Sequence, residues 1–481
     1  MYRYVHKNFR PFSAVCDNNY GRDKIITNKN RIDASNICDE LAKALPIHNG
    51  NANEIEYLER YYSGDQLILY RKKENRPEVN NKVVTNLAMY IVETKASEMA
   101  GEPIQYILRG TEEEKSEQIS KLNNIMEGED KACDDIELCR WRSICGTAYR
   151  FIGKDDYQGN VLDETPFYLS VENPMYTFVV YYANNRPAFS CQIREDEDGK
   201  EIFYVYTNSE WFIIMQNKII DSGINGNGAI PVIEYPNNER RLSDIEITIS
   251  ITDELNRMAS DRANGIEQFV SAWVKFVNCE IDSETYKKMR QEGALVVKSN
   301  NGSDNKADVD VMTSELNQSE TQVAVDDLLE KLLIVQGMSN RQSSSSSGDT
   351  QGAVLMRNGF YEKEKRSELS EPIFKKSERM ALRIILNRLR IEQGFTLMPS
   401  DVEVKISRTK MDNIYTKVES LKLMLDSGIY PDRAIKTVGI WSDPEQVAIE
   451  SRDRMDILYP REVENTLNEQ NSDNNVVIDN E

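Results

Sequence analysis

Five consecutive serines, Ser343–Ser347, interrupt the most helix-like part of this chain. A polyserine run cannot bury apolar surface, so it predicts a flexible loop. Helical patterns lie on both sides, over Glu315–Gln336 and Ala353–Gln393. By itself such a loop indicates an interdomain linker. Between two rigid helices it has a second interpretation, as a loop that is presented to a ligand.

Composition limits the classes of protein to which the chain can belong. Its 481 residues are enough for two to four domains, and an apolar fraction of 40% supplies a core. The net charge of −21 argues against a protein coated in nucleic acid, which needs a surplus of Lys and Arg on its contact face. Local basic patches are still possible. An acidic surface would also let nucleic acid pass without sticking.

Cysteine and histidine usage argues against most enzymes. The seven cysteines are widely spaced and indicate a reducing compartment rather than a disulfide framework. Cys133, Cys139 and Cys145 recur every six residues, a spacing that suits buried apolar positions on a helix and not a zinc site. The two histidines, His6 and His48, have no nucleophile motif nearby. We therefore predict no catalytic residue, metal or cofactor.

No run of 18 apolar residues and no signal-peptide core occurs in the sequence. We therefore expect no membrane span, and synthesis in a cytoplasm.

The first half of the chain predicts helices followed by an antiparallel β region. A plain turn is expected at Gly223–Gly228. The expected helices are Ala34–Ala44, Asn53–Tyr70 with a break at Ser63–Gly64, Lys82–Ala100 and Glu112–Cys145. The expected strands are Ile104–Leu108, Tyr149–Ile152, Phe167–Val171, Thr177–Tyr182, Ala188–Ile193, Ile202–Thr207, Trp211–Gln216 and Ile230–Tyr235.

The second half predicts long helices around a small β insert, so the fold class is α+β and mainly helical. Ser243 and Glu246 form a capping box that starts a helix reaching Trp273. Pro372 predicts a kink near Glu368–Pro372. The insert comprises strands Lys275–Ile281, Ala294–Ser299 and Asp308–Thr313 with a short helix Ser283–Glu292. A strand Val402–Ile406, helices Ile414–Leu425, Pro431–Val438 and Asp443–Leu458, and a disordered tail follow.

Charge is segregated along the chain. Arg357–Arg390 holds ten Lys and Arg against five Asp and Glu, whereas the residues beyond Trp441 hold three Arg against eleven acids. The basic helix is either a solvated face bound to acidic neighbours or the lining of a channel.

Three groups of motifs, in this order, resemble the portal proteins of siphophages that infect Gram-positive bacteria, over about residues 50–460. The serine run is more polar than the family pattern, and Thr252 replaces an apolar residue. The first group is Asn81–Val84 through Met99–Ile104. The second is Ile230–Ile233 with Pro236–Asn238, Ser243–Glu246, Ile251–Asn256 and Ser260–Asp261. The third is the junction from Ser347–Gly348 to Gly352–Ala353.

The resemblance implies a ring of about twelve subunits around a channel at one capsid vertex of the virion, made in the cytoplasm of a bacterial host. Each subunit would have wing, stem, clip and crown regions and a tunnel loop. The implied regions are a wing at 1–242, stem helices at 243–272 and 315–337, a clip at 273–314, a tunnel loop at 338–352, a long kinked wing helix at 353–400, and a crown at 401–481.

The resemblance also implies partners and contact residues. Double-stranded DNA would pass through the channel without sequence readout, and the terminase large subunit, a head-completion or adaptor protein, and the major capsid and scaffolding proteins would dock. Contacts with DNA would come from Asn340, Arg341, Gln342, Ser343, Ser344, Ser345, Ser346, Ser347 and Gly348, with Arg357, Lys363 and Lys365 lining the channel. Partner docking at the clip would use Lys287, Lys288, Arg290 and Lys298.

Two rival hypotheses stay open at this point. The first is another virion scaffold, such as a minor head or baseplate protein. The second is an acidic cytoplasmic enzyme with a mobile loop, against which the scarcity of histidine argues.

Overall fold

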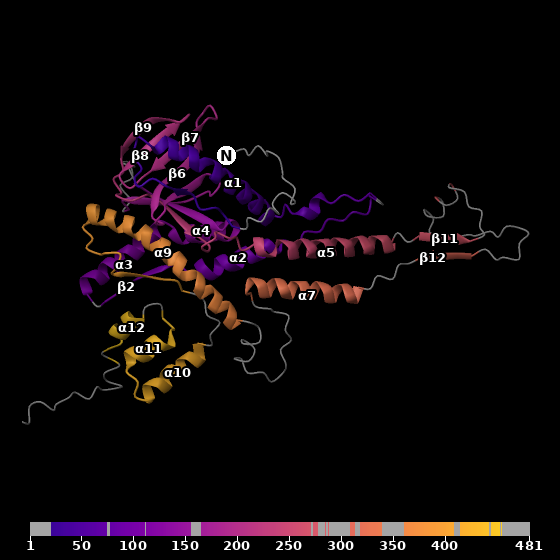
Figure 1. Ribbon diagram of the computed structural model, residues 1–481. Coiled ribbons are helices and arrows are strands. Elements are labelled where there is room, and N and C mark those ends of the chain that lie inside the picture. Colours follow the sequence, from indigo (N-terminus) through magenta and orange to yellow (C-terminus); the bar gives the residue numbers. More distant parts are fainter. Residues whose placement is uncertain are drawn as a thin grey trace, which may run out of the picture. The chain divides into compact units, whose positions relative to one another are not determined.

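The computed structural model (Figure 1) describes residues 21–74, 77–110, 112–154, 165–270, 273–277, 284, 287, 308–312, 318–338, 360–407, 414–441, 444–452 and 454. Two compact units are present. The first, which we call the body, comprises Met1–Gly101 and Ile125–Pro399, and the second, the C-terminal unit, comprises Glu102–Asn124 and Ser400–Glu481. Helices and strands both contribute, which confirms the α+β class.

The first helix, α1 (Ile37–Tyr62), corrects the prediction of two separate helices. It runs through Pro46 and the turn-like Asn49–Asn51 without a break. Tertiary partners explain the continuity. The Asn51 side chain accepts a hydrogen bond from the Asp23 N–H (2.8 Å) and donates to the Asp23 carbonyl (2.9 Å). The predicted break at Ser63–Gly64 is confirmed, and Gly64 has φ +96°. A short 3₁₀ turn, η2 (Leu67–Tyr70), follows.

Two further helix predictions need correction. Helix α2 (Leu87–Ala100) begins at Leu87 and not at Lys82, because residues 81–86 are not helical and Asn86 has φ +45°. The predicted helix Glu112–Cys145 is two helices, α3 (Glu113–Gly128) and α4 (Lys131–Cys145), separated at Asp130 with φ +50°. On α4, Cys139 and Cys145 are buried as expected, but Cys133 is exposed.

Two sheets form the β region of the body, and every strand predicted there is present. The larger has the order β1-β5-β6-β7-β8-β9, antiparallel apart from the β1–β5 pair. Side chains of α1 such as Ile37 and Leu41 pack on it with Phe178, Phe189 and Val205. Its strands are β1 (Ile26–Thr27), β5 (Thr177–Tyr182), β6 (Pro187–Glu195), β7 (Glu201–Tyr206), β8 (Glu210–Met215) and β9 (Lys218–Ile224). The smaller is β10-β3-β4, from β3 (Thr147–Lys154), β4 (Phe167–Glu172) and β10 (Val232–Pro236).

Strand β9 was not predicted. Its last two residues, Gly223 and Ile224, belong to the segment Gly223–Gly228 that was expected to be a turn. Gly223 lies opposite Trp211 in the β8–β9 register. A Cβ at Gly223 would lie 2.7 Å from the Trp211 ring, so this position requires glycine for a close approach.

The second half of the body is built from long helices. The capping box is confirmed, since the Ser243 N–H donates to the Glu246 carboxylate (2.7 Å). The helix starts with a 3₁₀ turn, η3 (Glu246–Thr248), before α5 (Ile249–Val270). Its predicted end at Trp273 is wrong, because Trp273 begins β11 (Trp273–Val277), which pairs antiparallel with β12 (Asp308–Met312).

Helices α7 (Gln318–Gln336) and α9 (Phe360–Gln393) complete the body. Pro372 lies inside α9, and the kink expected there stays a prediction. The strand expected at Ala294–Ser299 lies outside the described residues. Of the short helix expected before it, only Glu284 and Lys287 are described, both helical.

In the C-terminal unit, β13 (Val402–Lys405) pairs antiparallel with β2 (Gln105–Leu108). Both strands were predicted, but their pairing was not. Helices α10 (Ile414–Asp426), α11 (Pro431–Val438) and α12 (Pro444–Glu450) follow, and Gly428 with φ +83° ends α10 as expected. The predicted end at Leu458 and the tail lie outside the described residues. None of the described helices is both long and apolar enough to cross a membrane.

Candidate functional site at the α5–α7 helix pair

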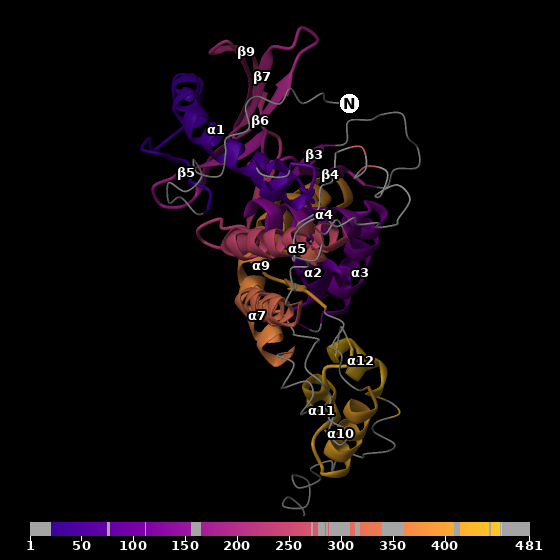
Figure 2. The same cartoon turned by 90° about the vertical axis from the view of Figure 1, so that its right-hand side faces the viewer.

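Helices α5 and α7, which flank the β11–β12 hairpin in the sequence, lie side by side (Figures 1 and 2). A small apolar cluster joins them to α2 at one end. It contains Leu255 of α5, Leu332 and Leu333 of α7, Ile91 of α2 and Met338. The helix pair therefore has a shared apolar seam that is anchored on the body.

A row of buried polar side chains on α5 binds the extended segment 81–86. Asn256, Ser260 and Asn264 recur every four residues and are 0%, 0% and 3% exposed. Asn264 accepts from the Asn81 N–H (2.7 Å), and Ser260 accepts from the Val83 N–H (2.9 Å). Asn256 accepts from both the N–H (2.9 Å) and the hydroxyl (2.8 Å) of Thr85. We call these three side chains the polar ladder.

The spacing of the polar ladder follows from two backbone geometries. Four helical residues rise about 6 Å, and two extended residues span about 6.6 Å. Alternate N–H groups of the extended segment therefore meet successive turns of α5. Buried backbone donors must find partners, and this segment has no sheet neighbour. The polar ladder thus replaces the helical start that the sequence had predicted at Lys82.

The C-terminal end of α7 is held by two cations from other helices. The Lys95 ammonium of α2 donates to the Gln336 carbonyl (2.8 Å). The Arg366 guanidinium of α9 donates to the carbonyls of Ile334 (3.3 Å) and Val335 (3.0 Å). Cations at this position satisfy the last carbonyls of a helix and its negative dipole end. We call Lys95 and Arg366 the α7 clamp.

The Gln336 side chain adds a link to the start of α5. Its amide donates to the Asp244 carbonyl (2.6 Å) and to the Thr248 hydroxyl (2.9 Å). Gly337 then ends α7 with φ +66°, where a Cβ would collide with the Arg366 side chain. The chain therefore leaves α7 at a point fixed by α2, α5 and α9 together.

Most of the residues predicted to contact DNA or partners lie outside the described residues. This holds for the whole tunnel-loop set 340–348, for Arg357 and for the clip residues Lys288, Arg290 and Lys298. Lys363 lies in α9, but its side chain is not described. Lys365 is exposed and pairs with Glu368 (2.9 Å), and Lys287 is exposed. The contacts predicted for these residues stay a prediction.

A buried ion cluster fixes α9 to the body. The Glu378 carboxylate of α9 lies 3.0 Å from the Lys131 ammonium of α4 and 3.4 Å from the Arg150 guanidinium of β3. Asp135 of α4 pairs with both cations, and Tyr235 of β10 donates to Glu378 (2.7 Å). Two cations face two carboxylates, so the cluster is neutral and its role is structural.

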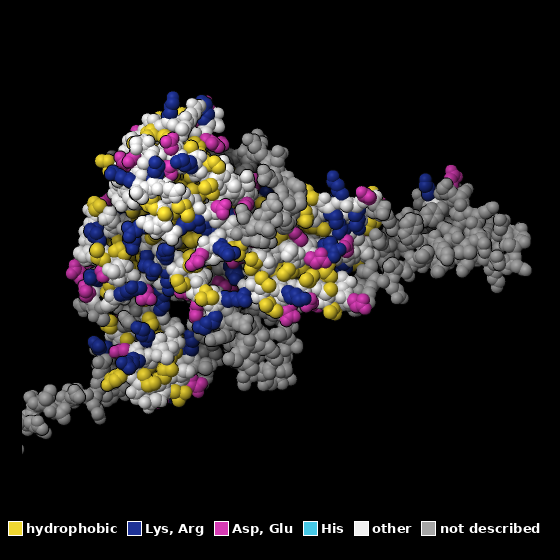
Figure 3. All heavy atoms as spheres, in the orientation of Figure 1, with side chains coloured by type: hydrophobic (Ala, Val, Ile, Leu, Met, Phe, Trp, Pro, Cys, Tyr) yellow, Lys and Arg dark blue, Asp and Glu magenta, His cyan; other side chains and the backbone are white. Residues whose placement is uncertain are grey.

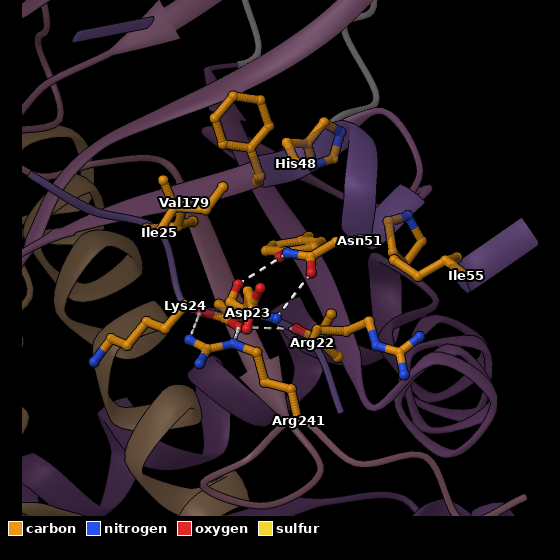
Figure 4. Close-up of a pocket in the computed structure, with 14 residues that line it drawn as sticks. Arg22, Asp23, Lys24, Ile25, His48, Asn51, Ile55, Val179 and Arg241 are labelled. Atoms are coloured by element: carbon orange, nitrogen blue, oxygen red, sulfur yellow. Dashed lines mark hydrogen bonds and ion pairs between the residues drawn. The ribbon is translucent and has the colours of Figure 1, made fainter. Parts of the chain in front are cut away.

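A small pocket lies between residues 22–25, α1 and Arg241 (Figure 4). Ion pairs surround it, among them Arg22–Glu54 (3.2 Å) and Arg241–Glu234. His48 stacks on Phe178 with ring centroids 4.3 Å apart. Burial lowers the pKa of His48 to about 4, so the imidazole is neutral at pH 7.

The hydroxyl in this pocket that lies beside a carboxylate belongs to a buried hydrogen-bonded network. Thr147 donates to Glu234 (3.0 Å), and Arg241 and Tyr181 bind the same carboxylate. Over the part of the chain that the structure describes, no group of three His, Cys, Asp or Glu side chains could hold a metal ion.

Sequence reasoning missed the residues that position the helix pair. The polar ladder had a signal, since Thr248, Thr252, Asn256, Ser260 and Asn264 place a small polar residue on one face of a helix every four residues. The α7 clamp had none, because Lys95 and Arg366 are two of many cations in the chain.

The described residues centre on a helix pair, and comparison with known proteins identifies the family. The chain belongs to the family described as "Phage portal protein, SPP1 Gp6-like", whose model matches residues 41–456. A portal protein of Clostridium phage phiCD119 is 24% identical over 424 residues, which cover 79% of this chain and 91% of that relative. The family is one of structural virion proteins and not of enzymes, so the resemblance seen in the sequence is confirmed.

Two solved structures are also similar to this chain. A chain from the "neck of native GTA particle computed with C12 symmetry" aligns with a TM-score of 0.45 and 12% identity, covering 74% of this chain and 90% of that one. A chain from the "neck of empty GTA particle computed with C6 symmetry" aligns with a TM-score of 0.42 and 13% identity. The alignment covers 76% of this chain and 89% of that one.

Proposed function

We propose that copies of this chain assemble into a ring of about twelve subunits at one capsid vertex. Double-stranded DNA would enter and leave the capsid through the central channel, without sequence readout. The ring would also dock the terminase large subunit during packaging and a head-completion or adaptor protein afterwards. Membership of the portal family over residues 41–456 is the observation that carries this proposal.

Exposed apolar side chains on the helix pair support a ring of identical subunits. Ile266 of α5 is 50% exposed, and Val323 and Ile334 of α7 are 68% and 58% exposed. Figure 3 shows hydrophobic side chains along α5 and α7 on the side that faces the viewer. Exposed apolar patches of this kind favour contact with another protein surface, and a neighbouring copy would supply one.

The regions of the subunit follow from this proposal. The α5–α7 pair would be the stem and the β11–β12 insert the clip. Residues 1–242 with α9 would form the wing, and residues 401–481 the crown. The serine segment would be the tunnel loop, whose two ends are the end of α7 and the start of α9. The α7 clamp then holds the point from which the loop starts.

The physical mechanism requires weak contacts with moving DNA. A net charge of −21 repels phosphates, which favours sliding over binding. Serine hydroxyls and the Asn340 and Gln342 amides contact phosphates without reading sequence. Terminase would supply the energy by ATP hydrolysis, since this family is not enzymatic.

Assembly is tested on the purified full-length chain by native mass measurement and negative-stain imaging. The proposal expects a closed ring with a central hole. A mass that corresponds to a monomer or dimer under all conditions, with no ring class in the images, would refute it. A minor head or baseplate scaffold is the alternative that this result would favour.

The tunnel loop is tested by deleting Ser343–Ser347 and, as a matched control, by replacing the five serines with five glycines. We expect rings from both variants and loss of DNA packaging from the deletion. Glycine keeps the loop length and removes the hydroxyls, so the control separates the two contributions. Loss of assembly by the deletion would show that the segment is structural and would remove the channel role.

A further inference from the structure

One face of α9 carries cations without partners. Lys376, Arg379 and Arg383 are exposed, and their spacing of three and four residues places them in one row. None of the three forms an ion pair or hydrogen bond with a described residue. By contrast, Lys375 on the neighbouring face pairs with Glu371 (3.0 Å). We call Lys376, Arg379 and Arg383 the basic row.

The surroundings of the basic row are also positive. The pKa of the Lys24 ammonium is lowered by burial first and then by the positive charge of Arg241, with Lys376 contributing and Glu234 opposing. Lys24 therefore lies near enough to Lys376 to be repelled by it. Figure 3 shows Lys and Arg side chains gathered over α9. Among the described residues, none of the three cations of the basic row is paired with a carboxylate.

Net charge does not cancel such a patch in solution. Salt screens exposed charges beyond about 8 Å at physiological ionic strength. The row itself spans about 10 Å, since seven helical residues rise by that amount. A polyanion on the row therefore responds to these three cations more than to the distant carboxylates.

The absence of apolar anchors favours a phosphate backbone over a protein partner. Among the described residues of α9, the exposed large hydrophobic side chains are Leu369 and Ile391, which lie outside 376–383. Protein interfaces have aromatic or aliphatic centres and few lysines, whereas phosphate contacts need only cations and polar groups. Duplex DNA carries one charge per about 1.7 Å of its axis, so several phosphates lie within reach of the row.

We propose that the basic row of α9 is a sequence-independent binding site for the phosphates of double-stranded DNA, separate from the serine segment. The choice of DNA as the polyanion rests on the proposed function. The observation that the three cations are unpaired is independent of that function. The contact is weak and depends strongly on salt.

The magnitude follows from counterion release. Three phosphate contacts give a slope of about −2.7 for log K against log salt concentration, or a loss of about 40-fold between 50 and 200 mM salt. The triple variant Lys376→Gln, Arg379→Gln, Arg383→Gln removes all three contacts. We expect it to weaken binding by tenfold or more at 50 mM KCl and to flatten the salt dependence.

A control variant removes the same charge elsewhere. Lys200→Gln, Arg257→Gln, Lys331→Gln also lowers the net charge by three, but each of these exposed cations pairs with a neighbouring carboxylate. We expect the control to bind DNA within about twofold of the wild type. Equal weakening by both variants would show that only net charge matters and would overturn the proposal.

The experiment measures fluorescence anisotropy of a labelled 30-base-pair duplex with the full-length wild type and both variants, from 50 to 200 mM KCl. Negative-stain images of each protein show separately whether rings form. Absence of rings would count against the proposed function and leave the anisotropy result valid. Failure of the wild type to bind at 50 mM KCl would overturn the basic row as a DNA site. So would displacement of the duplex by a peptide of residues 455–481 at equal charge concentration, which would assign the row to an acidic protein segment.

Discussion

The polar ladder predicts a graded loss of local stability along α5. Asn256→Ala removes the acceptor for the Thr85 N–H and hydroxyl, and also the donor to the side-chain oxygen of Gln66 (2.5 Å). Three lost hydrogen bonds cost about 3 kcal/mol, and alanine returns about 0.5 kcal/mol through its helix propensity. Of these three bonds, the two to Thr85 hold residues 81–86, so opening of this segment is expected to become easier by about 2 kcal/mol.

Ser260→Ala removes a single acceptor, that of the Val83 N–H. Its cost is about 1 kcal/mol, offset by about 0.5 kcal/mol of helix propensity. Ser250 is exposed on the same helix and provides a matched control, because Ser250→Ala changes propensity alone. The difference between the two serine variants therefore isolates the hydrogen bond.

Hydrogen exchange measured by mass spectrometry reports this local opening without requiring reversible unfolding. For Asn256→Ala we expect exchange in peptides that cover residues 79–88 to accelerate by about 30-fold, since 1.4 kcal/mol corresponds to a factor of ten. Peptides from β6 and β7 should not change. Unchanged exchange in residues 79–88, or a larger effect from Ser260→Ala than from Asn256→Ala, would refute the assignment of these bonds.

Three further predictions concern the α7 clamp, the ion cluster and the buried histidine. Arg366→Met removes a cation from the C-terminal end of α7 and should lower the free energy of unfolding by about 1 kcal/mol. The control Lys365→Met removes an exposed ion pair and should lower it by less than about 0.5 kcal/mol. Urea titration measures both values. Glu378→Gln leaves two buried cations with one carboxylate and should cost about 3 kcal/mol or more, visible as a lower Tm and soluble yield than for the exposed control Glu368→Gln. The folded-state pKa of His48, about 4, is below its ordinary value of 6.5, so the unfolded chain binds the proton first and stability falls as pH decreases from 6.5 towards 4. The expected loss of unfolding free energy is about 2 kcal/mol between pH 7 and pH 5. The variant His48→Gln should lack this loss, and the same pH dependence in the variant as in the wild type would contradict the prediction.

Local patterns were sufficient to predict the elements whose ends are set by their own residues. Helix α11 matches its prediction at both ends because Pro431 starts it and Gly439, with φ +59°, ends it. Apart from β1 and β9, the strands of the β region were predicted because short Val, Ile, Tyr and Phe runs alternate with turn residues. These signals act over a few residues and need no knowledge of the rest of the chain.

Elements fixed by distant partners could not be predicted in this way. Asn51 is a typical turn residue, and its place inside α1 depends on its bonds with Asp23. Residues 82–86 were predicted to be helical, and their actual conformation depends on the polar ladder of α5. In each case a tertiary hydrogen bond outweighed a local propensity of about 0.7 kcal/mol or less per residue. The same holds for the candidate site, since Lys95 meets the end of α7 across 241 residues of sequence.

The polar ladder also explains why this helix pair is held by hydrogen bonds and not by apolar contacts alone. An apolar seam tolerates small sliding motions, because its energy depends on buried area and not on direction. The polar ladder does not tolerate sliding. A shift of segment 81–86 by one residue would turn all three N–H groups away from Asn256, Ser260 and Asn264. The α7 clamp acts at the adjacent helix end. Together, the polar ladder fixes α5 against segment 81–86, and the clamp fixes α7 against α2 and α9. In a ring of identical subunits a register error would recur at every interface, so direction-dependent bonds at this position favour a single geometry for the whole assembly.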